Sequence, residues 1–314
     1  MAVEPRLKQD LSQVVDVGQW IADNEFEYNL PGAKPKRTLV APDAGYQPFL
    51  LSGHRYIFKS PAGRAVQQIW SEVIAYELAR HVGVSVPPAF LAYNHIGDVP
   101  GVLIEFFYGY RFEEPVRLVH AIEAFQGANQ PVNFKHGSLR DNIALCRAQK
   151  VVDWKAWWAK TIAFDALIGN TDRHSENWGF LVAPDPAQER RFAMSPAFDN
   201  GTSLGALVRD EDLDHHLRAQ NFRKFLDRGA HHVAWLRDSD HGAKHAELCG
   251  QVAAVYGGVD YMAPIFTLSD SIIERTVEWC TGFDFPVPFS LRRAEFVAAQ
   301  LKARRAAIAA AVGG

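Results

Sequence analysis

Apolar residues recur at helical spacing in some segments of the chain and gather into short runs in others. Positions 66, 69, 70, 73, 74, 78 and 82 make a helical stripe, and Gly83 marks the end of that helix. Residues 55–60 (RYIFKS) predict a short strand, and the apolar run at 99–107 predicts a buried strand. The first part of the chain is therefore predicted to be β-rich with one long helix.

The pattern changes after a polar stretch at residues 126–142. Residues 153–168 are aromatic-rich and helical in period, and they lead directly into the polar segment GNTDRHSEN at 169–177. Short strands are predicted at 178–183 and 191–194, on either side of a turn that contains Pro-Asp-Pro. This pattern places the polar segment between a helix and a pair of strands.

The last third of the chain, from residue 206, is mainly helical in period and closes with an Ala- and Arg-rich helix at 291–311. A chain of 314 residues is long enough for two lobes that share a cleft. We therefore predict an α+β, bilobal protein-kinase-like fold. Its β-rich N-lobe is expected at residues 1–115 and its mainly α-helical C-lobe at 116–314.

Composition narrows the classes of function. The net charge is −3 and the pI is near 6.5, so bulk charge predicts no general affinity for polyanions, and we expect no direct nucleic-acid partner. The three cysteines are far apart and form no CxxC, which argues against a disulfide framework or a zinc site. The N-terminus lacks the apolar core of a signal peptide, and no apolar run approaches the length of a membrane span. We expect a cytoplasmic protein with no membrane span.

The most informative residues are Asp172, Asn177 and Asp199. Asp172 follows a helix, Asn177 comes five residues later, and Asp199 ends a second apolar run. Phosphoryl transfer needs one carboxylate to orient the attacking hydroxyl, and an amide oxygen and a second carboxylate to hold Mg²⁺. Asp172 alone is more typical of a turn, and Asn177 of a strand-edge cap. Together they favour an ATP-dependent kinase, with Arg173 and His174 as braces of the loop.

The first lobe offers residues for the nucleotide. Lys59 on its strand and Glu72 on the next helix offer the ion pair that positions ATP phosphates in kinases, with Glu77 as the competing partner. The loop PGAKPK is a candidate phosphate loop, because glycine permits close backbone approach and the lysines are positive; a basic surface turn is the alternative. The last strand of the lobe ends where a kinase hinge would lie, at Glu105, Phe106 and Phe107.

These motifs together resemble those of the HipA-like serine/threonine kinases. Members of that family carry a GNTDxHxxN segment, a later aromatic-Asp metal motif, an upstream GAxxK loop and a strand lysine. The corresponding segments here are GNTDRHSEN, SPAFDNG, PGAKPK and YIFKSP, in the same order. The stretch SEVIAYELARHVGVSVPP is also similar to the family's helix and following turn. The resemblance runs from about residue 29 to at least residue 230.

The resemblance implies a bilobal kinase that uses ATP and Mg²⁺ and phosphorylates a protein hydroxyl. It implies that Asp172 and Lys59 are catalytic and that Asn177 and Asp199 bind magnesium. The implied nucleotide site consists of Pro31, Gly32, Ala33, Lys34, Pro35, Lys36, Lys59, Glu72, Glu105, Phe106, Phe107, His174, Asn177, Phe198 and Asp199. HipA toxins inhibit bacterial growth, pair with a DNA-binding antitoxin and act on aminoacyl-tRNA synthetases. The resemblance therefore also implies a synthetase or another translation factor as the protein substrate, and an antitoxin partner.

The sequence departs from the HipA toxins in two ways. Those toxins have a sizeable subdomain ahead of the glycine loop, whereas 28 residues precede Asn29 here, and we expect that subdomain to be lacking. They also carry an autophosphorylated serine just before the loop glycine, at the place of Asn29. These departures argue against self-inactivation by loop phosphorylation and against the usual toxin–antitoxin interface.

Other functions remain alternatives on the sequence alone. The same residues would serve a lipid kinase of the phosphoinositide type or a small-molecule kinase, although no clear basic or amphipathic membrane face favours a lipid. A catalytically silent kinase fold would serve as a binding module. The complete set of motif residues argues against that last alternative.

Overall fold

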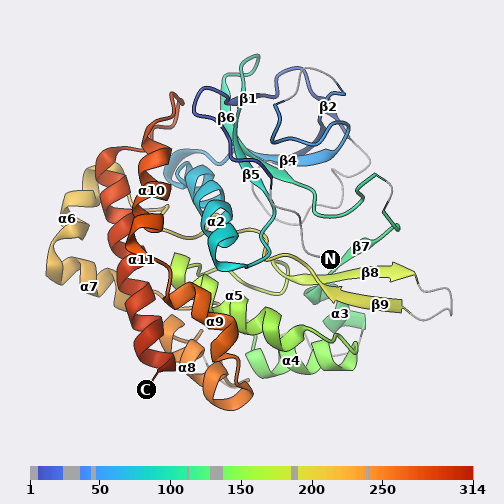
Figure 1. The fold of residues 1–314 in the computed structure, drawn as a ribbon, viewed down its shortest axis with the longest axis vertical. Coiled ribbons are helices and arrows are strands. Elements are labelled where there is room, and N and C mark those ends of the chain that lie inside the picture. The colour runs from blue at the N-terminus through green and yellow to red at the C-terminus, as the bar shows by residue number, and fades with distance from the viewer. Residues whose placement is uncertain are drawn as a thin grey trace.

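The computed structural model describes residues 6–23, 36–43, 47–111, 113–127, 137–184, 190–237, 239 and 241–313. Within these residues, a curled sheet of six strands forms the first part of the chain, in the order β1-β5-β6-β4-β3-β2 (Figure 1). The strands are β1 (Val15–Asp16), β2 (Ile21–Ala22), β3 (Lys36–Val40), β4 (Arg55–Lys59), β5 (Ala89–Asn94) and β6 (Val99–Glu105). β3 and β4 pair antiparallel, and their register places Lys36 opposite Lys59. The sheet thus brings two lysines side by side.

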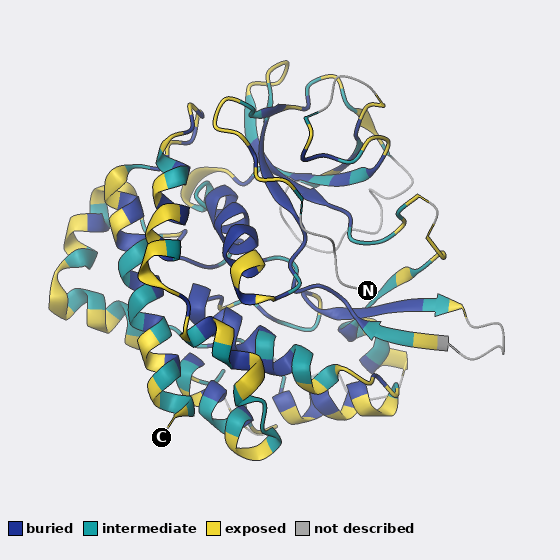
Figure 2. Cartoon of the chain, viewed as in Figure 1, coloured by how far each residue is buried: buried dark blue, intermediate teal, exposed yellow. Residues whose placement is uncertain are grey.

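Helix α2 (Gln68–Val82) packs against this sheet and is buried almost all along its length (Figure 2). The apolar stripe predicted from the sequence is buried except at Val66, which is partly buried, and the polar Ser71, Glu72 and Glu77 are buried as well. Burial of both faces means that the helix lies between the sheet and the C-terminal part of the chain. Its polar side chains therefore need partners within the protein.

Aromatic side chains anchor α2 in the C-terminal part. Trp70 donates its indole N–H to the Val287 carbonyl (2.9 Å). Its ring lies 5.2–6.0 Å from the rings of Phe283, Phe285 and Phe289. The helix that carries Glu72 is thus attached to both parts of the molecule.

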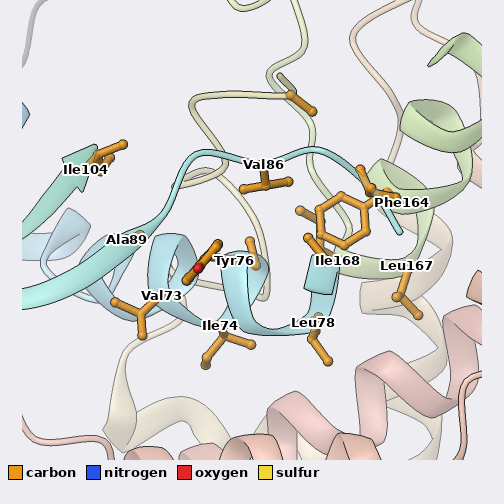
Figure 3. Close-up of a cluster of buried hydrophobic side chains, with 14 of the residues drawn as sticks. Val73, Ile74, Tyr76, Leu78, Val86, Ala89, Ile104, Phe164, Leu167 and Ile168 are labelled. Carbon is orange, nitrogen blue, oxygen red and sulfur yellow. The ribbon is translucent and has the colours of Figure 1, made fainter. Parts of the chain in front are cut away.

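Helix α5 (Trp154–Ile168) runs through the centre of the C-terminal part, and its last turns reach the N-terminal part. Figure 3 shows Phe164 and Ile168 of α5 close to Val86, with Leu78 of α2 nearby. All four side chains are buried in one continuous core. This packing fixes the end of α5, from which the polar loop emerges.

A second sheet and further helices complete the described structure. The second sheet pairs β7 (Arg117–His120), β8 (Gly179–Pro184) and β9 (Arg190–Met194) in that order. The other helices are α3 (Ala121–Gly127), α4 (Leu139–Ala148), α6 (Leu213–Leu217), α7 (Ala219–Arg228), α8 (His245–Tyr256), α9 (Val259–Phe266), α10 (Asp270–Thr281) and α11 (Leu291–Val312), with short 3₁₀ turns at Gly63–Ala65 and Asp210–Asp212. None of the helices in the described ranges is both long enough and apolar enough to span a membrane.

The α+β fold class predicted from the sequence is confirmed, as are the predicted long helices and the strands β4, β6, β8 and β9. Strands β1, β2, β3, β5 and β7 were not predicted. The first two have two residues each, too short for a periodic signal. The first sheet ends at Glu105 and β7 belongs to the second, so the lobe boundary near residue 115 stays a prediction.

Two glycines allow a matched test of the packing behind the polar loop. Gly83 and Gly169 end α2 and α5 with similar left-handed backbones (φ 63° and 67°). A Cβ at Gly169 would lie 2.7 Å from Arg304 Cζ, whereas the nearest atom at Gly83 is Lys160 Nζ at 4.0 Å. We expect Gly83→Ala to lower the free energy of unfolding by about 1 kcal/mol. Gly169→Ala should lower it by about 2–4 kcal/mol, because a buried guanidinium must also move.

Urea unfolding of both variants, followed by tryptophan fluorescence, measures this difference. Equal losses in the two variants would show that Arg304 does not constrain the end of α5.

Candidate active site

Asp172 lies in the loop that joins α5 to β8, and polar side chains hold its backbone. Asn170 Oδ1 accepts a hydrogen bond from the Asp172 N–H (3.0 Å), and Asn177 Nδ2 donates to the Asp172 carbonyl (2.7 Å). The Asp172 side chain is 40% exposed and accepts a long hydrogen bond from Thr202 (3.4 Å). Its backbone is therefore held while its carboxylate is accessible to a substrate hydroxyl.

His174 braces this loop from within. Its Nε2 lies 3.2 Å from Asn177 Nδ2 and 3.6 Å from Asp172 Oδ1. Because Nδ2 of Asn177 is turned toward the loop, Oδ1 is the atom of this amide that can serve as a metal ligand. The bracing role expected of His174 thus agrees with its position.

Lys59 connects the two parts of the molecule at the centre of the site. Its ammonium lies 2.9 Å from Glu72 Oε1 and 3.1 Å from Asp199 Oδ1. Burial lowers the pKa of Lys59, but the charges of Asp199 and Glu72 outweigh it and raise the pKa well above its ordinary value. Glu77, the competing partner, pairs with Arg80 instead (3.0 Å).

The segment around Asp199 is tied to the same helix. The Asn200 N–H donates to the second carboxylate oxygen of Glu72 (3.1 Å), so Glu72 binds both the strand lysine and the backbone beside Asp199. Asp199 itself has a left-handed backbone (φ 57°), which is costly for a residue other than glycine. The surrounding hydrogen bonds hold it in that conformation.

Arg173 joins the loop of Asp172 to the segment of Asp199. It is fully buried, and its Nε and Nη2 donate to the two oxygens of Asp165 (3.0 and 2.8 Å). Its Nη1 donates to the carbonyls of Asn177 (2.9 Å) and Phe198, and Nη2 also donates to Asn200 Oδ1 (2.7 Å). All five N–H groups of the guanidinium are therefore used.

Asp165 is the buried anion of this network. Besides Arg173, it accepts hydrogen bonds from Asn170 Nδ2 (3.1 Å) and His231 Nε2 (3.0 Å). Burial raises the pKa of Asp165, but Arg173 and His231 outweigh it, so the pKa lies well below its ordinary value. The Val233 N–H donates to His231 Nδ1 (3.0 Å), so Nε2 carries the ring proton that binds Asp165.

The sequence profile of the HipA-like C-terminal domain matches residues 28–255. This chain belongs to the HipA-like family.

Solved structures with a similar fold include two relatives of low identity. CtkA, a proinflammatory kinase of Helicobacter pylori, is 18% identical with a TM-score of 0.73, and the match covers 96% of this chain and 99% of that one. HipA of Shewanella oneidensis MR-1, solved with HipB and its operator DNA, is 18% identical with a TM-score of 0.50, and the match covers 88% of this chain and 64% of that one. No curated protein sequence matches the chain. At this identity the likeness shows the fold, which is a HipA-like kinase fold.

The HipA-like phosphate loop falls mostly outside the described residues. Pro31, Gly32, Ala33, Lys34 and Pro35 lie there, and so does Asn29. Lys36, the last residue of the predicted loop, begins β3 opposite Lys59. The phosphate-binding role of this loop stays a prediction.

Residues of the predicted adenine hinge form hydrogen bonds with residues of the N-terminal part of the chain. The N–H groups of Glu105 and Phe106 donate to the carbonyls of Pro88 and Arg55. The Glu105 carboxylate binds Arg6 through two hydrogen bonds of 2.8 Å.

Phe107, of the predicted hinge, contacts the segment that carries Asp199, because its ring stacks on Phe198 (5.5 Å between centroids). The nucleotide role of Glu105, Phe106 and Phe107 stays a prediction, and the position of Phe107 favours it most.

The donor set of this HipA-like site suits magnesium. In the described part of the chain, no group of three His, Cys, Asp or Glu side chains gathers as a zinc or iron site would require. Asn177 and Asp199 offer one amide and one carboxylate oxygen, and Mg²⁺ takes few protein ligands and keeps its waters. These two residues fit the predicted ion.

The buried support of the site was only partly predictable. Arg173 was expected to brace the loop, but Asp165 and His231 were not identified. The signal for Asp165 was a charged residue in the otherwise apolar helical run IAFDALI. His231 lies 66 positions away, and no local pattern connects the two.

Removal of Arg173 tests the support it gives. Arg173→Met leaves the Asp165 charge buried without its main partner, so we expect the free energy of unfolding to fall by about 3–5 kcal/mol. Arg191→Met is the matched control, because Arg191 forms an exposed ion pair with Glu114 (2.6 Å) and should change stability by less than about 1 kcal/mol. Urea unfolding at neutral pH measures both. Losses of similar size would contradict the central role of the buried pair.

His245 makes the stability of the folded protein depend on pH. It is buried, its Nε2 donates to the Asn170 carbonyl (2.7 Å), and burial with the nearby Arg304 charge lowers its pKa from 6.5 to about 3. As the pH falls below about 6.5, His245 is therefore protonated in the unfolded chain but stays neutral in the folded one. The free energy of unfolding should fall by about 2 kcal/mol from this group between pH 7 and pH 5.

His245→Gln retains an N–H donor and removes the titration. Its loss of stability between pH 7 and pH 5 should be smaller than that of the unmodified protein by about 2 kcal/mol. Asp165 cannot cause this difference, because its effect begins only as the pH falls below the ordinary pKa of an aspartate. Identical losses in both proteins would contradict the prediction.

Proposed function

We propose that this HipA-like chain is a kinase that uses ATP and Mg²⁺ to phosphorylate a serine or threonine hydroxyl of a protein. The observation that carries the proposal is the bridge from Lys59 to Glu72 and Asp199, at 2.9 and 3.1 Å. It unites the strand lysine, the glutamate of α2 and the metal-binding aspartate in one site. The description of the structural neighbour CtkA as a kinase supports the same activity.

Each residue would have one role in phosphoryl transfer. Asp172 would accept the hydrogen bond of the acceptor hydroxyl and take its proton late in the reaction. Lys59 would exchange the Asp199 carboxylate for phosphate oxygens of ATP. Asn177 Oδ1 and Asp199 would then hold Mg²⁺, which neutralises phosphate charge when bound.

The rigidity of the site favours this chemistry. Phosphoryl transfer depends mainly on positioning and on charge stabilisation by groups already in place. Arg173 ties the carbonyls of Asn177 and Phe198 to one buried guanidinium, so the residues proposed to bind the metal share a common support.

A protein partner of the antitoxin kind is part of the proposal. The Shewanella HipA was solved in complex with HipB and operator DNA, which supports such a partner for a member of the same family. A growth-inhibiting role, a substrate among the translation factors and a cytoplasmic location complete the proposal.

The proposed base is tested by Asp172→Asn, with labelling of proteins in a cell lysate by γ-labelled ATP and Mg²⁺. We expect incorporation to fall by about 10²–10⁴-fold, because the acceptor hydroxyl loses its base. Asp260→Asn, which changes an exposed carboxylate on α9, should label like the unmodified protein. Calorimetry of Mg-ATP binding should give similar affinities for all three proteins.

Three results would contradict parts of this proposal. Equal labelling by Asp172→Asn and the unmodified protein would remove Asp172 from the reaction. Label in extracted lipid rather than protein would favour the lipid kinase. No binding of Mg-ATP by the unmodified protein would leave the chain as a binding module.

A further inference from the structure

A depression of about 490 Å³ opens beside the loop of Asp172. Thr171, the residue before Asp172, forms part of its rim and is exposed. The other lining residues come from the segment after α7 and from the approach to α8. They are Ala230, His231, His232, His241, Gly242 and Lys244.

This depression lies next to the surroundings of the proposed base. The ring of His232 lies 5.5 Å from the ring of His174, whose Nε2 is 3.6 Å from the Asp172 carboxylate. His232 also lines a second, smaller hollow together with His174 and Ser175. A residue whose hydroxyl meets Asp172 would therefore have its chain neighbours beside this depression.

The lining carries basic side chains. Every ionisable residue that lines it within the described ranges is a histidine or a lysine: His231, His232, His241 and Lys244. The Lys244 ammonium donates to the backbone carbonyl of Asp227. This contact orients the ammonium without neutralising its charge.

A second positive charge lies behind the wall. Arg304 is buried, and its Nη2 is 3.0 Å from the place of a Cβ on Gly229, next to Ala230 of the lining. Burial lowers the pKa of Arg304 to about 10, and among the described residues its Nε has no hydrogen-bond partner. The Arg304 charge therefore adds to that of Lys244.

The walls are fixed to the support of the site. The His231 N–H donates to the Ala243 carbonyl (2.8 Å), and the Ala243 N–H donates to the Val233 carbonyl (3.1 Å). His231 in turn donates to the buried Asp165 (3.0 Å). The two segments of the lining therefore hold their positions relative to the loop of Asp172, and the depression is formed before a ligand arrives.

We propose that this depression binds a carboxylate side chain of the protein substrate, an aspartate or glutamate close in sequence to the phosphorylated serine or threonine. Lys244, which is exposed, attracts the carboxylate, and the rings of His232 and His241 line the same depression. Both ring nitrogens of His231, by contrast, are bound to Asp165 and Val233. The proposal rests on the protein-kinase function proposed above and adds the sequence preference of its substrate.

A positional peptide library built around a central serine tests this preference. With γ-labelled ATP and Mg²⁺, the unmodified protein should favour Asp and Glu over Lys and Arg at one or two positions beside the serine. Lys244→Glu should shift the ratio of acidic to basic selection at those positions by about five- to tenfold toward basic residues, since an attraction becomes a repulsion. Lys155→Glu, an exposed lysine of α5 outside the depression, gives the same change in net charge and should retain the acidic preference.

The outcomes separate this inference from the function on which it rests. Phosphorylation without an acidic preference, or with a preference that Lys244→Glu leaves unchanged, would overturn the inference and leave the kinase intact. No phosphorylation of any peptide or lysate protein would count against the kinase itself.

A binding measurement tests the depression without catalysis. Fluorescence anisotropy with a labelled Glu-Glu-Ser-Glu-Glu peptide should show weaker binding to Lys244→Glu than to Lys155→Glu. Equal affinities would overturn the inference.

Discussion

The buried ion pair between Arg173 and Asp165 is the interaction on which the candidate site depends. Two charges removed from water are stable only when every donor and acceptor around them is satisfied. Here the guanidinium uses all five N–H groups, and the carboxylate accepts from Asn170 and His231 as well. Satisfying these charges requires that the end of α5, the polar loop and the segment after Phe198 meet in one arrangement. Burial of this ion pair therefore disfavours any other arrangement of these three segments.

Two carboxylates meet one ammonium at the bridge in the centre of the site. Lys59 is the cation that contacts both Glu72 and Asp199. Nucleotide phosphates would meet net repulsion from these carboxylates unless a divalent cation arrived with them. The proposed use of magnesium therefore follows from electrostatics as well as from the identity of the ligands.

The sequence predicted the fold class and the residues that meet at the Lys59 bridge, because each lies in a motif of short range. It named Glu72 as the partner of Lys59 with Glu77 as the competitor, since the choice depends on which face of α2 meets β4. Both glutamates are buried, so the rule that polar side chains of a helix face solvent would have been wrong for each of them. The roles of Asp165 and His231 were not predicted for a related reason. Their contact joins positions 66 residues apart, and only the packing of α5 against the segment after α7 brings them together.

Trp70 has a consequence for how this site could be controlled. Its ring packs against Phe283, Phe285 and Phe289, and Trp70 lies two residues before Glu72 on α2. A helix held in this way cannot swing outward to break the Lys59 bridge without exposing a large aromatic surface to water. The segment between α10 and α11 therefore helps to hold α2 in place at a distance from the nucleotide site. A molecule that displaced this segment would remove the packing of Trp70 and so loosen the helix that carries Glu72.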